Sequence, residues 1–283
     1  MAQSTEYRNR LAIIAGGIGG LGSSIAVLLR SKGCRLALLY APFEASRRDE
    51  VLQDVYGTAN PEGIRTYEAD ITSESSVSIA FEAIYFDAIV DEVFPSILIN
   101  SAGYVTVQPL EQTSVEEANR NFSVNLLGPF ITGNAFFHLY QAMKKKIRDN
   151  GGVNVPPGRI VSLSSQASHL ALDGHGVYCA SKAGLNALVR CQANEWARYG
   201  ITSNTVSPTV ALTALGKKAW GEGKQREDHL ARIPTGRFVE PEEVARTIEW
   251  LCQDGAGMVN GADVRVDGGF TISGGFTVPI TEY

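Results

Sequence analysis

Tyr178 and Lys182 lie four residues apart in the stretch VYCASK. On a helix this spacing places both side chains on one face, about one turn from each other. An ammonium held near a phenol favours the phenolate and lowers the pKa of the phenol from about 10. Ser165, thirteen residues before the tyrosine, could bring a hydroxyl to the same point and hold a carbonyl oxygen. These groups could move a proton to or from an alcohol while a hydride moves elsewhere.

The Tyr178–Lys182 pair alone predicts no activity, because any long chain offers a tyrosine and a lysine at this spacing by chance. It would equally suit an ordinary amphipathic helix, which we expect from residue 178 to about residue 199. The pair gains meaning only if the rest of the chain builds a site for a nicotinamide cofactor.

A glycine-rich turn follows the first predicted strand, an apolar run over residues 11–15. It reads GGIGGLG over residues 16–22 and leads into a helical pattern over residues 23–31. Bare backbone at a helix N-terminus lets a pyrophosphate approach. Two registers fit, either Gly17, Gly19 and Gly22 or Gly16, Gly20 and Gly22. A flexible turn also uses glycine, so this stretch favours a dinucleotide site only in context.

The end of the second predicted strand, residues 35–40, bears on the choice between NAD and NADP. An NAD site usually places an acidic residue there, on the ribose diol. Here Tyr40 holds that position. Arg47 and Arg48 follow a turn later, but Glu44 would repel a 2′-phosphate. The sequence therefore leaves the cofactor phosphate open, and exposed charges opening a helix are the simpler interpretation of the two arginines.

Strands and helices alternate along the rest of the chain. Further strands are expected over residues 65–69, 97–99, 159–163, 201–206 and 264–266, and helices over 46–56, 74–90, 115–145 and 240–252. The pattern predicts an α/β fold: a single domain over residues 1–283, with a doubly wound parallel sheet of about seven strands and helices on both faces. Residues 148–158 read as a surface loop of unassigned role, and residues 271–283 as a tail whose candidate place is a subunit interface.

Two polar residues have more than one interpretation. Asp70 follows a strand, where it could contact the adenine or cap the next helix. If Thr72 or Ser73 caps that helix instead, Asp70 is free to contact the adenine. Asn125 falls on an apolar helix face and needs partners, either as a structural bridge or as part of a site.

Composition excludes several classes of function. The net charge is −5, and the only basic cluster, residues 144–146, suits a solvated helix end, so nucleic acid is not an expected partner. The four scattered cysteines suit a reducing compartment, the cytoplasm. The polar N-terminus is no secretory signal, and no run of eighteen apolar residues predicts a membrane span. The four histidines lack ligand spacing, so no metal site is expected.

The motifs, in this order, resemble the short-chain dehydrogenase/reductase family over roughly residues 8–272. The resemblance rests on the glycine turn in its second register, the N-x-A-G turn at Asn100, Y-x-x-x-K at Tyr178, V-S-P at Val206, V-D-G-G at Val266, and Asp70, Asn125 and Ser165 at their family positions. Departures are Ala15, Ser101 and Thr209, where the family usually has threonine, asparagine and glycine. Gly19 stands where NADPH-preferring members often carry arginine.

The resemblance implies a role for each matching residue. Tyr178 would be the general acid/base, and Lys182 would lower its pKa and hold the nicotinamide ribose. Ser165 would bind the substrate oxygen, and Asn125 would anchor a water-borne proton relay. NAD or NADP would be held by Gly16, Gly20, Leu21, Gly22, Tyr40, Asp70, Ile71, Asn100, Ala102, Gly103, Tyr178, Lys182, Pro208, Val210 and Thr213. A homotetramer is implied as well.

The loop P-T-V-x-L-T at Pro208, the segment from Leu215 to Trp220, and Ser164, Gln166 and His175 carry a narrower similarity. It points to the L-xylulose reductase and polyol dehydrogenase branch of that family. It implies a substrate loop over residues 209–235 and a sugar pocket lined by Gln166, Leu172, His175 and Trp220. An indole can cover a C–H face, and amide and imidazole groups can bind hydroxyls. The expected reaction is the interconversion of a small polyol and its ketose, or the reduction of a small dicarbonyl. The alternatives are a reductase of 3-oxoacyl thioesters or bulky ketones, and a dinucleotide-binding scaffold without turnover.

Overall fold

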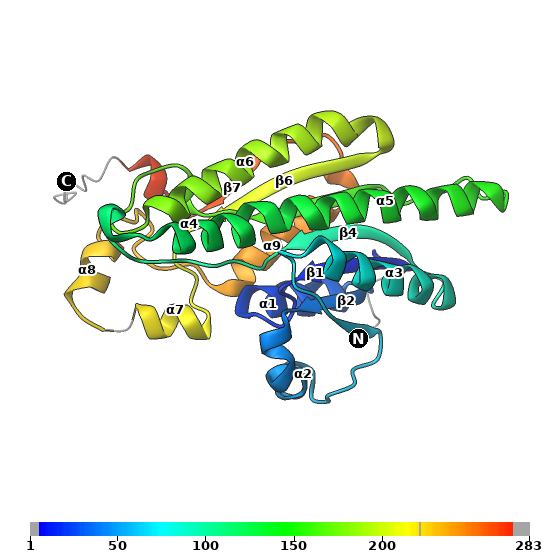
Figure 1. Cartoon of the computed structure of the whole chain (residues 1–283), viewed down its shortest axis with the longest axis horizontal. Coiled ribbons are helices and arrows are strands. Elements are labelled where there is room, and N and C mark those ends of the chain that lie inside the picture. The colour runs from blue at the N-terminus through cyan, green and yellow to red at the C-terminus, as the bar shows by residue number, and fades with distance from the viewer. Residues whose placement is uncertain (1–5, 221, 274–283) are drawn as a thin grey trace, which may run out of the picture.

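The computed structural model describes residues 6–220 and 222–273. Seven parallel strands form one sheet in the order β3-β2-β1-β4-β5-β6-β7 (Figure 1). Their bounds are β1 Arg10–Ala15, β2 Arg35–Tyr40, β3 Ile64–Glu68, β4 Phe94–Asn100, β5 Gly158–Leu163, β6 Ile201–Pro208 and β7 Asp263–Val266. The strand order reverses direction between β1 and β4, which is where ligands bind in doubly wound sheets.

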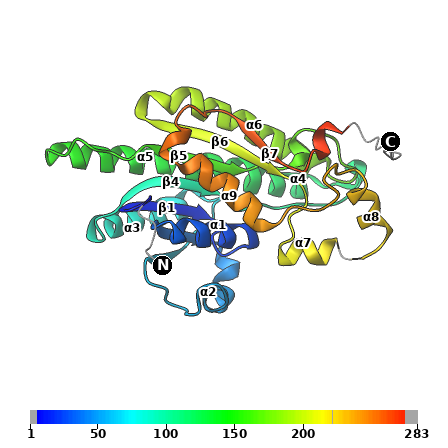
Figure 2. The ribbon, with the colours of Figure 1, turned by 180° about the vertical axis from the view of Figure 1, so that it is seen from behind.

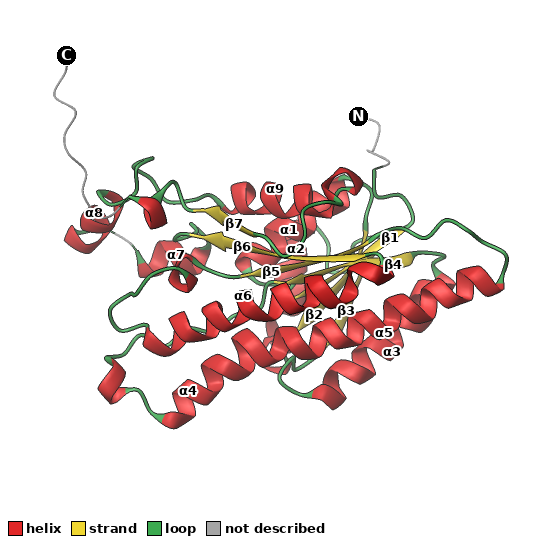
Figure 3. Cartoon of the chain, turned by 90° about the horizontal axis from the view of Figure 1, so that it is seen from above, coloured by secondary structure: helices red, strands yellow, loops and turns green. Residues whose placement is uncertain are grey.

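Helices cover both faces of the sheet (Figure 3). One layer contains α1 Gly20–Ser31, α2 Arg48–Tyr56 and α9 Pro241–Cys252, of which α1 and α9 lie in front of the sheet in Figure 2. The other contains α3 Glu74–Val90, α4 Val115–Phe122, α5 Gly128–Asp149 and α6 Gly176–Trp196. Two short helices, α7 Ala214–Ala219 and α8 Lys224–Leu230, project at one end. The predicted doubly wound α/β sheet is therefore confirmed.

Alternation along the strands explains why both faces need helices. In β1, Ile14 belongs to the core under α1 and α9, while its neighbour Ile13 belongs to the core under α3 and α5. Both side chains are completely buried. Successive strand residues point to opposite faces, so a strand that is apolar throughout requires cover on both sides.

Several predicted boundaries were wrong. β4 begins at Phe94, three residues before the predicted start, because Pro95 still pairs with Leu11 of β1. The single helix predicted over residues 115–145 is two helices joined by a π-helical turn, Ser123–Leu127. Residues 42–47 form a 3₁₀ turn before α2. α6 begins two residues before Tyr178 and ends at Trp196, with one 3₁₀ turn after it.

No helix within residues 6–220 and 222–273 is both long and apolar enough to cross a membrane. In the predicted surface loop, residues 151–154 are exposed. The predicted tail is described only to residue 273, with a 3₁₀ turn over Phe270–Ile272, and residues 274–283 lie outside the described part.

Candidate active site

The glycine turn after β1 is packed so closely that side chains are excluded. Gly16 has a φ of 75°, and a Cβ built on it would lie 2.8 Å from the backbone nitrogen of Ala102. A Cβ on Gly22 would lie 2.1 Å from the Gly16 carbonyl oxygen, and one on Gly20 would lie 2.8 Å from Cβ of Thr213. A Cβ on Gly19 would meet only one atom, at 3.2 Å. Gly17 is closed as well, since a Cβ there would lie 2.9 Å from the side chain of Leu38. The open position of Gly19 is therefore what favours the register Gly16, Gly20, Gly22 over Gly17, Gly19, Gly22.

The same turn leaves polar backbone available to a ligand. Helix α1 starts at Gly20, and no side chain caps its N-terminus at Gly19. The first N–H groups of a helix, including that of Leu21, have no partner within the helix and favour an anion. The turn therefore fits the pyrophosphate of a dinucleotide, which the resemblance implies.

The loop after β6 packs against the glycine turn. Pro208 ends β6, and the Val210 carbonyl accepts a hydrogen bond from the Val239 amide at 3.2 Å. Thr213 packs over Gly20, while its hydroxyl caps α7 by accepting from the Gly216 amide at 3.1 Å. Thr213, which the resemblance assigns to the cofactor, thus already has a structural role.

Asp70, where the adenosine part of the cofactor is expected, had two interpretations, and the structure decides against one of them. Ser73, not Asp70, caps α3 by accepting from the Ser76 amide. The Asp70 carboxylate instead accepts from the Thr72 amide at 2.9 Å and from its hydroxyl at 2.7 Å. The side chain of Ile71 packs towards Gly128 of α5. Asp70 is thus not the cap of α3, and its contact with adenine stays a prediction.

Asn100, at the end of β4, uses its side chain to join neighbouring elements. Its amide nitrogen donates to Ser162 of β5 at 3.1 Å, and its amide oxygen accepts from Thr132 of α5 at 2.7 Å. The side chain is only 4% exposed. Any contact of Asn100 with a cofactor would therefore involve its backbone. Gly103, three residues later, is exposed and has no side chain to obstruct a ligand.

Lys182 lies at the centre of the site. It is 4% exposed, and its Nζ donates to the carbonyl of Leu163, the last residue of β5, at 2.8 Å. Nζ lies 5.8 Å from the centre of the Tyr178 ring. A Cβ built on Gly103 would lie 3.8 Å from Nζ and 3.6 Å from Oδ1 of Asn125. The structure thus brings Lys182 close to Tyr178, Asn125 and the N-x-A-G turn.

The expected lowering of the Tyr178 pKa is absent from the protein alone. Burial raises the pKa of the Tyr178 phenol, and interaction with Ser165 acts in the opposite direction. Burial also lowers the pKa of Lys182 to about 8. Both shifts have one cause, since removing a charge from water disfavours the phenolate as well as the ammonium. Ser165 itself accepts a hydrogen bond from the Ala167 amide at 3.1 Å.

Asn125 occupies the π-helical turn and is completely buried. Its Oδ1 accepts from the Tyr104 amide at 2.8 Å, and its Nδ2 donates to the Tyr104 carbonyl at 2.7 Å and to the Ser181 hydroxyl at 3.0 Å. Ser181 directly precedes Lys182. The side chain is therefore a structural bridge, one of the two interpretations above, and the proton relay stays a prediction.

The residues predicted for a sugar pocket fall into two groups. Gln166 is buried beside Ser165, and the His175 ring lies edge-on to the Tyr178 ring with centres 6.3 Å apart. Leu172 is partly buried in the same loop, and its carbonyl accepts from the His175 amide at 3.0 Å. Trp220 instead packs against the ring of His229, with centres 4.6 Å apart, in a small core formed with Ile233, Phe238 and Phe270.

Three features of the site had not been inferred from the sequence. The carbonyl of Leu163 is the partner of Lys182, the backbone of Tyr104 is the partner of Asn125, and Ser181 joins Asn125 to α6. Carbonyl and amide partners leave no signal in side-chain types. Ser181 lies three residues after Tyr178, so helical spacing could have indicated it. In the described part of the chain, His, Cys, Asp and Glu form no group of three that could hold a metal ion.

Comparison with known proteins finds dehydrogenases and reductases that cover nearly the whole chain. A family model described as Enoyl-(Acyl carrier protein) reductase matches residues 16–271. The chain is 36% identical to a D-threitol dehydrogenase of Mycolicibacterium smegmatis, over 93% of each chain. It is 35% identical to an NAD-dependent glycerol dehydrogenase of Listeria innocua, over 93% of this chain and 94% of that one. A solved short-chain dehydrogenase/reductase from Serratia marcescens superposes with a TM-score of 0.78 at 25% identity, covering 94% of this chain and 99% of the other.

Proposed function

This chain belongs to the short-chain dehydrogenase/reductase family and is an NAD(P)-dependent oxidoreductase, and we propose that it interconverts a small polyol and its ketose. The relatives named for threitol and glycerol support this substrate class. In such an enzyme the bound nicotinamide supplies or accepts the hydride. The chain's own residues must bind the substrate oxygen and handle the proton.

Tyr178 is the proposed acid and base. In ketone reduction its phenol donates a proton to the oxygen of the carbonyl that becomes the alcohol, and in the reverse direction the phenolate accepts it. The Lys182 ammonium would favour the phenolate, and the Ser165 hydroxyl would hold the substrate oxygen. Asn125 would act indirectly, since it fixes the Tyr104 segment and α6 relative to each other.

One observation carries the choice of a polyhydroxy substrate. Gln166 is only 5% exposed, and no group in the described part of the chain hydrogen-bonds to its Oε1. A buried amide oxygen without a partner costs roughly 1–3 kcal/mol. Once the side chain turns towards the site, a substrate hydroxyl would donate to it, whereas an acyl chain would leave it unpaired. Gln166 follows Ser165 directly, so a hydroxyl near the reacting carbon is the suitable donor.

We expect Gln166→Met to raise KM for a tetrulose or L-xylulose roughly tenfold, the cost of one unmade hydrogen bond. The KM for diacetyl, which has no hydroxyl, should change little. Steady-state rates of NADH and NADPH oxidation measure both. Gln141→Met is the matched control, because Gln141 on α5 also has an unpartnered amide atom. Equal effects on both substrates, or a wild-type preference for an acetoacetyl thioester, would contradict the polyol assignment.

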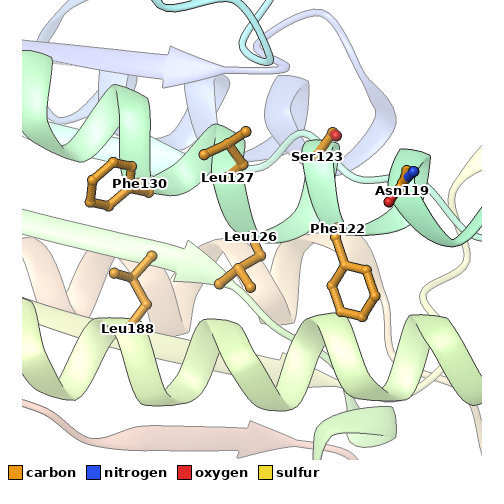
Figure 4. A pocket seen from close by; sticks show the side chains of 7 residues that line it. All are labelled: Asn119, Phe122, Ser123, Leu126, Leu127, Phe130 and Leu188. Atoms are coloured by element: carbon orange, nitrogen blue, oxygen red, sulfur yellow. The ribbon is translucent and has the colours of Figure 1, made fainter.

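We further propose that the enzyme is a homo-oligomer and that α4, α5 and α6 form one contact between copies. An apolar groove between these helices is lined by Asn119, Phe122, Ser123, Leu126, Leu127, Phe130 and Leu188 (Figure 4). Phe130 and Leu127 are 45% and 43% exposed. Contiguous exposed apolar surface of this kind is typical of subunit contacts.

The four free cysteines support a reducing compartment, so we place the enzyme in the cytoplasm.

Phe130→Glu should therefore reduce the oligomer to a smaller species, because a carboxylate in an apolar contact is unpaired. Light scattering after size-exclusion chromatography measures the mass. Phe86→Glu, on α3 and 57% exposed, is the control and should leave the mass unchanged. If the Phe130 variant keeps the wild-type mass, this groove is not the contact.

A further inference from the structure

A carboxylate is held at the end of β2, although the sequence places tyrosine there. Glu44 lies in the 3₁₀ turn Pro42–Arg47, which folds back on the strand end. Its Oε2 accepts from the Ala41 amide at 3.1 Å, and its own amide donates to the Ala41 carbonyl at 2.8 Å. Ala41 is the first residue after Tyr40. Glu44, four residues past the strand, thereby holds its charge beside the first residue after β2.

The backbone near this carboxylate offers little to a phosphate. The amide of Ala41 already donates to Glu44, and Pro42 has no N–H group. Phosphate groups in proteins are usually held by several backbone or side-chain donors together. The first two residues after β2 therefore supply no free donor for a phosphate on the adjoining ribose.

The guanidinium of Arg48, the first residue of α2, is already paired. Both Nε and Nη2 of Arg48 donate to Oδ1 of Asp49, the former at 2.8 Å, and Nη1 reaches the Thr66 hydroxyl at 3.5 Å. Arg47 is exposed. On the neighbouring strand, Glu68 pairs in register with Tyr40 and is exposed as well. Near the ends of β2 and β3, the two acids Glu44 and Glu68 thus outnumber Arg47, since Arg48 is paired with Asp49.

We propose that Glu44 selects NAD over NADP in this enzyme. This inference rests on the proposed function, because it assumes that the site binds a dinucleotide. A carboxylate has about four acceptor positions, and the bond to Ala41 uses one, so another can accept from a ribose 2′-hydroxyl. The same charge repels a 2′-phosphate, which carries up to two negative charges. Glu44 therefore supplies the acid that NAD sites usually place directly at the strand end.

The test is calorimetric titration of the full chain with NAD⁺ and with NADP⁺, without substrate. Wild type should bind NAD⁺ at least tenfold more tightly. Glu44→Gln keeps an oxygen for the Ala41 amide but loses the charge, so it should bring the two affinities within about threefold, mainly by tighter NADP⁺ binding. Glu44→Gln with Asp49→Asn should favour NADP⁺ further, because Arg48 is released. Glu50→Gln, an exposed acid on α2, is the matched control and should keep the wild-type ratio.

The outcomes separate this inference from the proposed reaction. Equal or tighter binding of NADP⁺ by wild type overturns it, as does an unchanged ratio in Glu44→Gln when the melting temperature shows that the variant is folded. Selective NAD⁺ binding by an enzyme that turns over no polyol supports the role of Glu44 and overturns only the substrate assignment. Failure of wild type to bind either dinucleotide overturns both.

Discussion

Replacing Tyr178 with phenylalanine should lower kcat/KM for the ketose by roughly 10³-fold or more, while the affinity for the dinucleotide stays within about threefold. The variant keeps the ring that packs beside His175 and loses only the hydroxyl that would transfer the proton. Burial disfavours ionisation of this phenol, so the substitution removes a neutral group and no charge, and the fold should be unaffected. Rates of NADH oxidation and calorimetric binding measure the two quantities separately.

Tyr199→Phe is the control for that variant. Tyr199 is 37% exposed and lies beyond the end of α6, so its hydroxyl has no role in the proposed chemistry. This variant should keep wild-type rates. Full activity in Tyr178→Phe would remove the proposed acid and base. A protein that binds cofactor but turns over no candidate carbonyl compound even as wild type would instead be a dinucleotide-binding scaffold.

Lys182→Met should be nearly as inactive, with kcat/KM lowered roughly 10²- to 10³-fold, because no ammonium would then stabilise the phenolate. Below pH 8 its effect on stability should be small. The variant leaves the Leu163 carbonyl without its donor, which costs about 1–3 kcal/mol, but it also removes a buried charge. Lys144→Met is the matched control, since Lys144 also donates to a backbone carbonyl, that of Tyr199 at 2.9 Å, at an exposed position.

The pKa of Lys182 predicts how this difference depends on pH. The folded-state pKa is about 8, below the unfolded value of about 10.4. Between these values the unfolded chain binds more protons at this residue, so Lys182 makes the unfolding free energy rise with pH. Relative to Lys182→Met, wild type should gain on the order of 3 kcal/mol from below pH 8 to above pH 10.4. Urea unfolding of both proteins across this range measures the gain, and a constant difference would show that folding does not lower the pKa of Lys182.

Patterns of apolar residues and glycine were enough to predict most of the sheet and the place of the site. The run over residues 11–15 is buried throughout, and the turn after it excludes side chains at the glycines expected to matter. Local spacing predicted these features because their causes are local: a strand covered on two faces must be apolar, and a backbone at φ 75° favours glycine.

Features that depend on distant contacts were not predictable in this way. A π-helical turn at Ser123–Leu127 changes the helical period over only five residues, too few to show in an apolar pattern. Pro95 and Ser96 interrupt the apolar run of β4, so the strand's true start at Phe94 was missed. The indole of Trp220 suits a sugar pocket as well as an aromatic cluster, and only the fold shows that it contacts His229 and Phe238.

The small core around Ile233, Phe238 and Phe270 is separate from the two cores that cover the sheet. Regions that have their own core can open as cooperative units at a lower free energy than global unfolding. Amide hydrogens of α7 and α8 should therefore exchange with solvent before those of β1 and β4. Both helices belong to the predicted substrate loop, residues 209–235, so the rate of their local opening would set an upper limit on the rate of product release.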